Sequence, residues 1–596
     1  MDGAQVEDVA EPRSAASDTS PAEEIGAGRP RSRRPSSREG APAGRVPKPR
    51  ARPPVSRIRS LPSPWRWLVV GAIALGFLLP VAEAVRALDH GWHPVGDVAL
   101  IGIRADDVFS SPPTLGQPTS AETIGAERES NHLGPIESYL LAPPMALLGP
   151  RLGLALGAAL INGAAWALAL FLAHRRGGMV LLGLVSVAIP LLVRSVGPSV
   201  LHDPINSDIA TLALIPLALA AWSMLDGDLA MAPLLAFLAT LVLQPHLSNA
   251  AVTVFLVGVG TAGIVAALRR RQPGDVRWVV GAAVLLVLLW LPPILHELGS
   301  GPSNLAQVWG TLWEPRRTVG VGFGLGRAAN AVAPWLLPFF ARAHQVSAPA
   351  GTISAAHLGL GLLVLGLVGF LAVLFHFAGR HRAARLLAIA DGVAAVSVYA
   401  TSVLPWGGVI RPEHGRWVWL LGALVWVGLA WSAWWLFGEP RQRTWGPRVV
   451  PALLVLGVLA GATTVTASPT EVNTGRWAMP RIEPLAKQIR AELPKGSYEL
   501  VPLGGAAFLT VAPGLLLELE RHGYRLYVPH VPFNRGYDDR HFYDDQPVRG
   551  TITLVGKGQV PPPADARLVV RQAPLPGAAL DGLLELDVYY ASGTPA

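Results

Sequence analysis

Long apolar runs separated by short polar connections dominate most of the chain. Eleven of these runs are long enough to cross a hydrocarbon core of about 30 Å. They predict eleven transmembrane helices, near 65–86, 151–173, 178–197, 207–225, 229–245, 249–268, 277–295, 356–378, 386–404, 415–437 and 448–466. The pattern therefore predicts a mainly α, polytopic membrane protein whose transmembrane domain occupies residues 63–466.

Different patterns flank this domain. Residues 1–62 are rich in Pro, Ser, Ala and Arg and have no apolar period, which predicts a disordered basic tail. Within 467–596, helical and strand-like patterns alternate at 482–493, 498–502, 514–522 and 524–528. This alternation predicts a small α/β domain at the C-terminal end.

Basic residues in the connections set the expected orientation. If the tail is cytoplasmic, every second connection is too, and four of these five are rich in arginine: 174–176, 269–277, 380–385 and 441–448. The fifth is a short acidic turn at 226–228. Because cytoplasmic loops carry an excess of Lys and Arg, we expect a multi-pass plasma membrane protein with its N-terminus inside and its C-terminus outside. Two large outer loops are predicted, at 87–150 and 296–355.

Composition narrows the class further. Hydrophobic residues make up 51% of the chain and charged residues only 15%, which excludes an ordinary soluble protein. Cysteine is absent, so neither disulfides nor thiolate metal sites can form. The net charge of +8 comes mostly from arginine, and we expect no nucleic-acid partner. The first apolar run begins near Trp65, so no cleavable signal peptide is predicted.

Several acids stand in the first outer loop. If residues 93–109 form a helix along the membrane surface, Asp97 and Arg104 fall on nearly one line and Asp107 lies about 80° away, whereas Asp106 points to the opposite side. Asp97 and Asp107 could then face one catalytic site, where Arg104 would keep both ionised. The alternative is a set of solvated acids on an amphipathic surface helix, and spacing does not choose between the two.

Two further groups of polar residues could bind a substrate. In Asn131–His132–Leu133–Gly134–Pro135 the histidine precedes a helix start where backbone donors are free. His132 and Glu137, on the first turn, could therefore orient a phosphate or an acceptor hydroxyl. The alternative is that they only cap that helix.

The second group opens a later span on the predicted outer face. Arg411, His414 and Arg416 lie where the charge rule keeps cations scarce, and a guanidinium binds phosphate in a bidentate manner. Headgroup contact, or pairing with Glu413, is the alternative. Aromatic and acidic residues at 534–545 predict sugar binding or, alternatively, an exposed turn.

These motifs resemble a known family. Gly96–Asp97–Val98 through Asp107, and then Asn131–His132–Leu133–Gly134–Pro135, resemble the first outer loop of GT-C membrane glycosyltransferases, especially actinobacterial arabinofuranosyl- and mannosyltransferases. Further segments that look similar are Asp203–Pro204–Ile205–Asn206, Gln244–Pro245–His246 and Leu291–Pro292–Pro293–Ile294. The resemblance covers roughly residues 65–440.

The resemblance implies an inverting transfer from a polyprenyl-phosphate sugar, with a catalytic aspartate in the first outer loop. Asp97 matches that position best and Asp107 second. Val98 stands where relatives often carry a second acid, which puts an acidic metal-binding pair there in doubt and leaves a divalent metal an open question. Leu133 stands where proline is usual.

The residue patterns and the family resemblance predict the same function. No folded cytoplasmic domain is predicted that could bind a nucleotide sugar, so the donor should be lipid-borne. We expect a membrane glycosyltransferase in which Asp97 is the general base and Arg411 or Arg416 holds the phosphate, acting on an envelope glycan, lipid or protein. The alternatives are a transporter or flippase, although repeated halves and charges at the bilayer midplane are not evident, and a non-catalytic glycan-binding scaffold.

Overall fold

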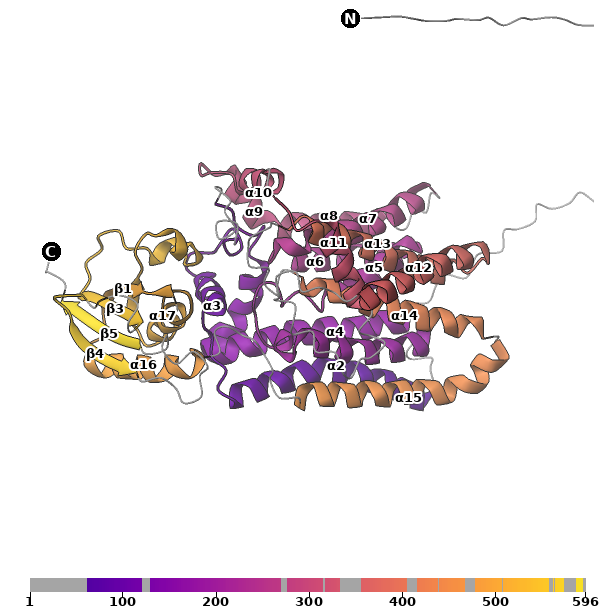
Figure 1. Cartoon of the computed structure of the whole chain (residues 1–596), viewed down its shortest axis with the longest axis horizontal. Coiled ribbons are helices and arrows are strands. Elements are labelled where there is room, and N and C mark those ends of the chain that lie inside the picture. The colour runs from indigo at the N-terminus through magenta and orange to yellow at the C-terminus, as the bar shows by residue number, and fades with distance from the viewer. Residues whose placement is uncertain are drawn as a thin grey trace, which may run out of the picture. The chain divides into compact units, whose positions relative to one another are not determined.

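The computed structural model describes residues 62–119, 129–269, 276–314, 317–332, 355–404, 415–437, 439–466, 477–505, 507–556, 561, 563–572 and 586–592. The predicted tail lies outside these residues, except for Pro62. The described part is mostly helical and carries one five-stranded sheet near the C-terminal end (Figure 1). A mainly helical chain with a small C-terminal sheet is therefore confirmed.

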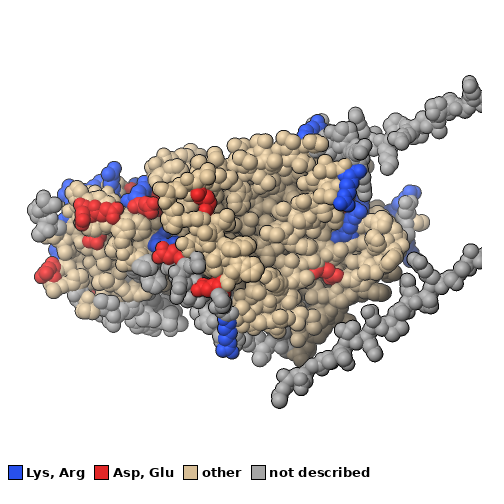
Figure 2. Space-filling model, turned by 90° about the horizontal axis from the view of Figure 1, so that it is seen from above, with Lys and Arg blue, Asp and Glu red and all other residues tan. Residues whose placement is uncertain are grey.

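Each predicted apolar run overlaps a helix. These helices are α2 (Ser63–Asp89), α4 (Ile136–Val196), α5 (Leu214–Leu225), α6 (Ala232–Leu243), α7 (Ala250–Arg269), α8 (Val276–Leu289), α12 (Ala355–Phe377), α13 (His381–Ser402), α14 (Trp419–Leu436) and α15 (Glu439–Thr466). Helices α2 and α15 pack along α4, and α5 packs on α7 (Figure 1). Figure 2 shows a face on which charged side chains gather toward the two ends, whereas few lie between them. That distribution suits a protein that spans a bilayer.

The predicted count of eleven spans is not confirmed. Seven helices among the described residues are long and apolar enough to cross a membrane, or eight if α8 and α9 (Leu291–Leu298), which meet at a bend of 55°, form one span. Helices α5 and α6 have 12 residues each, which gives a length of about 18 Å. That length is shorter than the hydrocarbon core. Hydropathy alone therefore predicted longer helices for these two segments than the structure has.

Helix α4 contains two of the predicted spans. Its 61 residues are interrupted by non-helical backbone at Gly149 and Gly178. The Asn162 side chain donates a hydrogen bond of 2.9 Å to the carbonyl of Val200, although these residues would lie about 57 Å apart in a continuous helix. The chain therefore folds back at Gly178, as the predicted connection near 174–176 requires.

Three of the connections that were predicted to be cytoplasmic meet at one end of the bundle. Arg176 pairs with Asp226, and Arg385 approaches the same carboxylate at 2.5 Å. Arg175 lies 2.5 Å from Asp228. The acidic turn at 226–228 thus neutralises arginines of two other connections, 174–176 and 380–385, which is why an acidic loop occurs among basic ones.

The predicted outer loops carry helices of their own. Helix α3 (Asp97–Asp107) lies in the first loop, and α10 (Asn304–Trp313) and α11 (Val321–Val332) lie in the second. Helix α11 packs against α12, α13 and α14, so part of the second loop belongs to the bundle. At the end of α13, the amide of Gly320 donates to the carbonyl of Ser402.

The C-terminal region forms a mixed sheet. Its strands are β1 (Ser497–Leu503), β2 (Arg525–Tyr527), β3 (Gly550–Gly556), β4 (Arg567–Gln572) and β5 (Leu586–Ser592), in the order β2-β1-β3-β5-β4. Strand β1 pairs in parallel with both of its neighbours, β2 and β3, whereas β5 is antiparallel to β3 and β4. Helices α16 (Met479–Glu492) and α17 (Ala512–Arg521) pack on each other, and α17 also packs on α3.

One glycine tests how α5 and α7 pack. A Cβ atom at Gly263 would lie 2.2 Å from the carbonyl oxygen of Met224, whereas a Cβ at Gly258 on the same helix would meet nothing within 4 Å. We expect Gly263→Ala to destabilise the protein by about 1–3 kcal/mol and Gly258→Ala to leave it unchanged. Thermal unfolding followed by size-exclusion chromatography in detergent measures the difference. Equal midpoints for the two variants would contradict this packing.

Candidate polar centre at one end of the bundle

The first outer loop places its acids in different environments. Helix α3 forms within the predicted segment, with Asp97 at its first position and Asp107 at its last. Asp97 and Asp106 are exposed, whereas Asp107 is fully buried. Asp106 and Asp107 differ in burial, but both carboxylates lie beside the Arg540 guanidinium, so Asp106 does not point to the opposite side from Asp107. Asp97 and Asp107 were expected to face one catalytic site. They are ten positions apart in α3, which separates their carboxylates by about 15 Å along the helix axis, so they do not share a site.

Arg104 is buried beside acids of the C-terminal domain. Its guanidinium donates to the carbonyl of Leu115 at 3.3 Å. Burial lowers the pKa of Arg104, and the nearby charges of Asp538, Asp107 and Asp539 partly offset that effect. Its environment therefore ties the first outer loop to the C-terminal domain, and a role in binding substrate stays a prediction.

The partners of Asp107 come from the same domain. Its carboxylate pairs with Arg540 and lies 3.6 Å from Nε2 of His541. His541 is also buried, and its Nδ1 lies 3.5 Å from the Glu520 carboxylate of α17. Asp107 is therefore held as a structural carboxylate rather than exposed to an acceptor. The sequence interpretation of 534–545 as a sugar-binding or turn segment missed this role of Arg540 and His541.

The segment 131–137 is bound from several sides. The backbone amide of Asn131 donates to Oδ1 of Asn304 at 2.8 Å, and Asn304 returns a hydrogen bond to the Asn131 carbonyl. Arg535 of the C-terminal domain donates to Oδ1 of Asn131 at 3.2 Å. A Cβ atom at Gly134 would lie 2.5 Å from the side chain of Gln244. A side chain at 134 would therefore displace Gln244 from its present position.

Gln244 and His246 also contact the segment 131–137. The amide of Ile136 donates to Oε1 of Gln244 at 3.2 Å. His132 packs against His246 with ring centroids 4.6 Å apart. Two motifs that looked separate along the sequence, 131–135 and 244–246, thus form one contact.

Backbone N–H donors determine which ring nitrogen carries the proton in neutral His132 and neutral His246. Nδ1 of His132 accepts from the amide of Leu247 at 3.1 Å, and Nδ1 of His246 accepts from the amide of Ser248 at 3.2 Å. Each neutral ring therefore carries its proton on Nε2. His132 supports the segment after His246, whereas α4 begins after Pro135 without a side-chain cap. The capping alternative for His132 is not observed.

Next to this contact lies a buried pair of acids. Glu137 is 5% exposed and its Oε1 accepts no hydrogen bond among the described residues. Asp208, which is 1% exposed, lies near enough to Glu137 for their charges to interact. Arg416 pairs with Asp208. Asp208 therefore stands between Arg416 and the region of Glu137, and any phosphate at Arg416 would have to compete with Asp208. The role of Asp208 was not predicted.

A second buried group was also missed. Glu83 at the end of α2 pairs with Arg86 at 3.1 Å and lies 3.9 Å from Nδ1 of His202. Burial, with a further contribution from the Arg86 charge, lowers the pKa of His202 to about 3. His202 is therefore neutral at ordinary pH. The signal available in the sequence was His202–Asp203, a polar pair between two apolar runs.

The remaining predicted residues have different outcomes. Arg411 and His414 lie outside the described residues. Within the described part of the chain, no group of three or more His, Asp or Glu side chains is arranged to hold a metal ion. In the segment 534–545, Phe542 stacks on His530 with ring centroids 4.3 Å apart, and burial raises the pKa of Tyr537.

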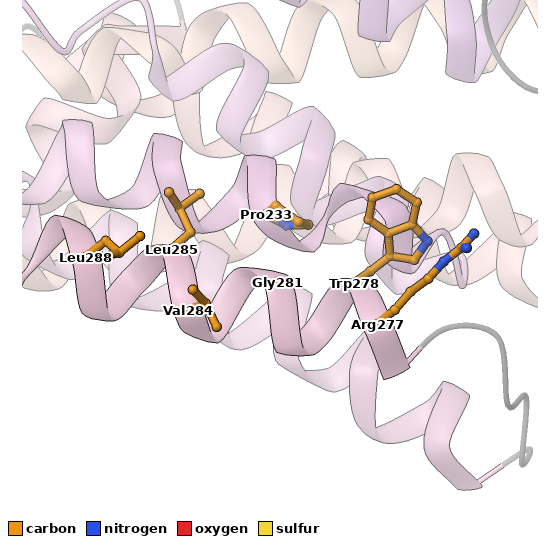
Figure 3. A pocket seen from close by; sticks show the side chains of 7 residues that line it. All are labelled: Pro233, Arg277, Trp278, Gly281, Val284, Leu285 and Leu288. Carbon is orange, nitrogen blue, oxygen red and sulfur yellow. The ribbon is translucent and has the colours of Figure 1, made fainter.

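A groove runs along the bundle surface on α8 (Figure 3). It is lined by Pro233 of α6 and by α8 residues Arg277, Trp278, Gly281, Val284, Leu285 and Leu288. The Arg277 guanidinium lies over the Trp278 ring at 5.0 Å. At the other end of α8, the Leu289 carbonyl accepts from Gln244. Residues 131–137, 208, 244–246 and 416 form what is called the polar centre below. The Arg277 end of the groove lies at the end of α8 that is far from this polar centre.

Comparisons with known proteins give little guidance. No protein-family model matches the chain, and no curated protein does. Among solved structures, the chain is similar to the crystal structure of ArnT from Cupriavidus metallidurans in the apo state, with 14% sequence identity, coverage of 88% of this chain and 98% of that chain, and a TM-score of 0.46. At that identity and TM-score the likeness is too distant to assign a family or an activity.

Proposed function

We propose that the chain is a membrane glycosyltransferase that moves a sugar from a polyprenyl phosphate to an acceptor hydroxyl on the outer face. The acceptor would be a cell-envelope glycan, lipid or protein. The resemblance of the motifs at 96–107 and 131–135 to GT-C transferases supports this class of enzyme.

The observation that carries the proposal is the convergence of buried polar side chains at one end of the bundle. The buried residues His132, Glu137, Asp208 and Gln244 come from distant segments, as does the half-buried Arg416. Hydrogen bonds from the amides of Ile136 and Leu247 connect Gln244 and His132 to this group, the charges of Asp208 and Glu137 interact, and Arg416 pairs with Asp208, so together they form one polar centre. Polar groups at this depth are costly unless they are paired or used. At the opposite end, the described residues include the pairing of arginines with Asp226 and Asp228.

The proposed chemistry needs one base and a cation. The base takes the proton from the acceptor hydroxyl while the oxygen attacks the anomeric carbon, and the bond from that carbon to the phosphate oxygen breaks with inversion. The phosphate leaves with the electron pair, as polyprenyl phosphate. Asp97 is the proposed base because it is the exposed carboxylate of the best-matching motif. Arg411 and Arg416 remain the proposed phosphate ligands.

The test is transfer by the purified protein in liposomes. Polyprenyl-phosphate arabinofuranose and polyprenyl-phosphate mannose are supplied separately, with a soluble glycan acceptor, and the release of polyprenyl phosphate is measured. We expect polyprenyl phosphate and glycosylated acceptor to form in equal amounts with one lipid donor, and no glycosylated acceptor to form with the corresponding nucleotide sugar. Movement of the intact donor across the bilayer without release would overturn the proposal in favour of a flippase. Glycan binding without release would favour a scaffold.

A further inference from the structure

The C-terminal domain contacts the first outer loop through ionisable groups that the proposed chemistry does not use. Arg540 pairs with Asp107 and lies 3.6 Å from Asp106, and its NH1 donates to Ser110 at 3.2 Å. His541 lies between Asp107 of α3 and Glu520 of α17. One short segment of the domain therefore binds the last turn of α3 through several charged contacts.

Burial distinguishes these contacts from an ordinary surface ion pair. The Asp107 and His541 side chains are 0% and 2% exposed, and Glu520 is 19% exposed. A buried pair is sensitive to the loss of either partner, because the remaining charge is left without compensation. The end of α3 should therefore depend on the state of these side chains.

We propose that His541 and Arg540 are positioning residues that hold α3 against the C-terminal domain through Asp107. The group formed by Asp107, Glu520, Arg540 and His541 is called the α3 clamp below. Because α3 also carries Asp97, the effect of the clamp on sugar transfer rests on the proposed function. The clamp itself rests only on the contacts described above.

The groups around His541 shift its pKa in different directions. Burial opposes protonation of His541, but its interaction with Asp107 and the charges of Glu520 and Asp107 outweigh burial and the opposing Arg540 charge, so the pKa of His541 is raised. Burial raises the pKa of Glu520, although His541 and Arg540 oppose that rise. Arg540 Nε also lies 3.2 Å from His541 Nε2, where a neutral ring would accept. The two flanking carboxylates favour the protonated ring.

The pH dependence of the clamp follows from these directions. A raised pKa in the folded protein means that the attraction of protonated His541 is fully present below its ordinary pKa of 6.5 and is lost as the pH rises through the raised value. At acidic pH, protonation of Glu520 removes one partner. The His541 contacts should therefore be present at pH 6 and weaken as the pH rises above the raised pKa, whereas the pairing of Arg540 with Asp107 remains.

The absence of cysteine makes a distance measurement straightforward. Spin labels at F109C, just after α3, and R525C, in the C-terminal domain, occupy exposed positions. In full-length protein in nanodiscs, we expect a narrow distance distribution at pH 6 that broadens at pH 9. His541→Gln should broaden it at both values, and Asp107→Asn should do the same. His530→Gln changes an exposed histidine of the same domain and serves as the control.

Two results would overturn the clamp. One is a distribution that stays narrow in both His541→Gln and Asp107→Asn, and the other is an equal broadening in His530→Gln. If His541→Gln fails to fold, Glu520→Gln removes the other carboxylate and should reduce the pH dependence. Transfer is measured on the same samples. A distribution that responds to pH in a protein without transfer activity would leave the clamp intact and refute the proposed function instead.

Discussion

Asp97→Asn is expected to reduce sugar transfer by roughly 10²- to 10⁴-fold, the usual contribution of a general base. The amide keeps the size of the side chain but cannot take a proton from the acceptor. Because Asp97 is exposed at the first position of α3, where a carboxylate interacts favourably with the helix dipole, the substitution should lower stability by no more than about 1 kcal/mol. The measurement is release of polyprenyl phosphate under saturating donor, with protein levels matched.

Asp106→Asn is the matched control for this prediction. It removes an exposed aspartate from the same helix, so it reports any general effect of lost charge. Equal rates for Asp97→Asn and the wild type would exclude Asp97 as the base. Glu137→Gln then decides whether a carboxyl group of the polar centre takes the role. Loss of transfer in Glu137→Gln alone would move the chemistry from α3 to the start of α4.

The local elements were the most predictable part of this fold. Helices α2, α7 and α12 and strand β1 occur where hydropathy and periodicity predict them, because each signal lies within one short window. Strands β3 and β5 were not predicted. Strand β3 pairs with β5 and with β1. Pairing between such distant segments leaves only a weak local sequence pattern.

The candidate site was predictable only in its separate parts. Residues 131–137 and 244–246 were noted as motifs, but their contact depends on how α4 and α6 pack, which no local pattern encodes. The same holds for Asp107, whose partners Arg540 and His541 come from a distant segment. Helical geometry compared angles around the helix, and it neglected both the distance along the helix between Asp97 and Asp107 and the reach of Arg540, which contacts Asp106 as well as Asp107.

The pair Asp208–Arg416 yields the largest expected effect on stability. Arg416→Met leaves Asp208, which is 1% exposed, without its cation, and breaking a buried pair in this way costs about 3–5 kcal/mol. Asp208→Asn should cost less, because the Arg416 side chain is 21% exposed and water can reach it. The double variant should be more stable than the sum of the single effects predicts, by about 1–3 kcal/mol.

Arg385→Met at the opposite end of the bundle is the control. Asp226 loses one arginine there but keeps Arg176, so the change in thermal midpoint should be small. A midpoint for Arg416→Met as high as that for Arg385→Met would contradict a dependence of Asp208 on Arg416. The same variants bear on phosphate binding. If Arg416 binds the donor phosphate, Asp208→Asn removes its competitor and should lower KM for the lipid donor, whereas an unchanged KM would assign Arg416 to structure alone.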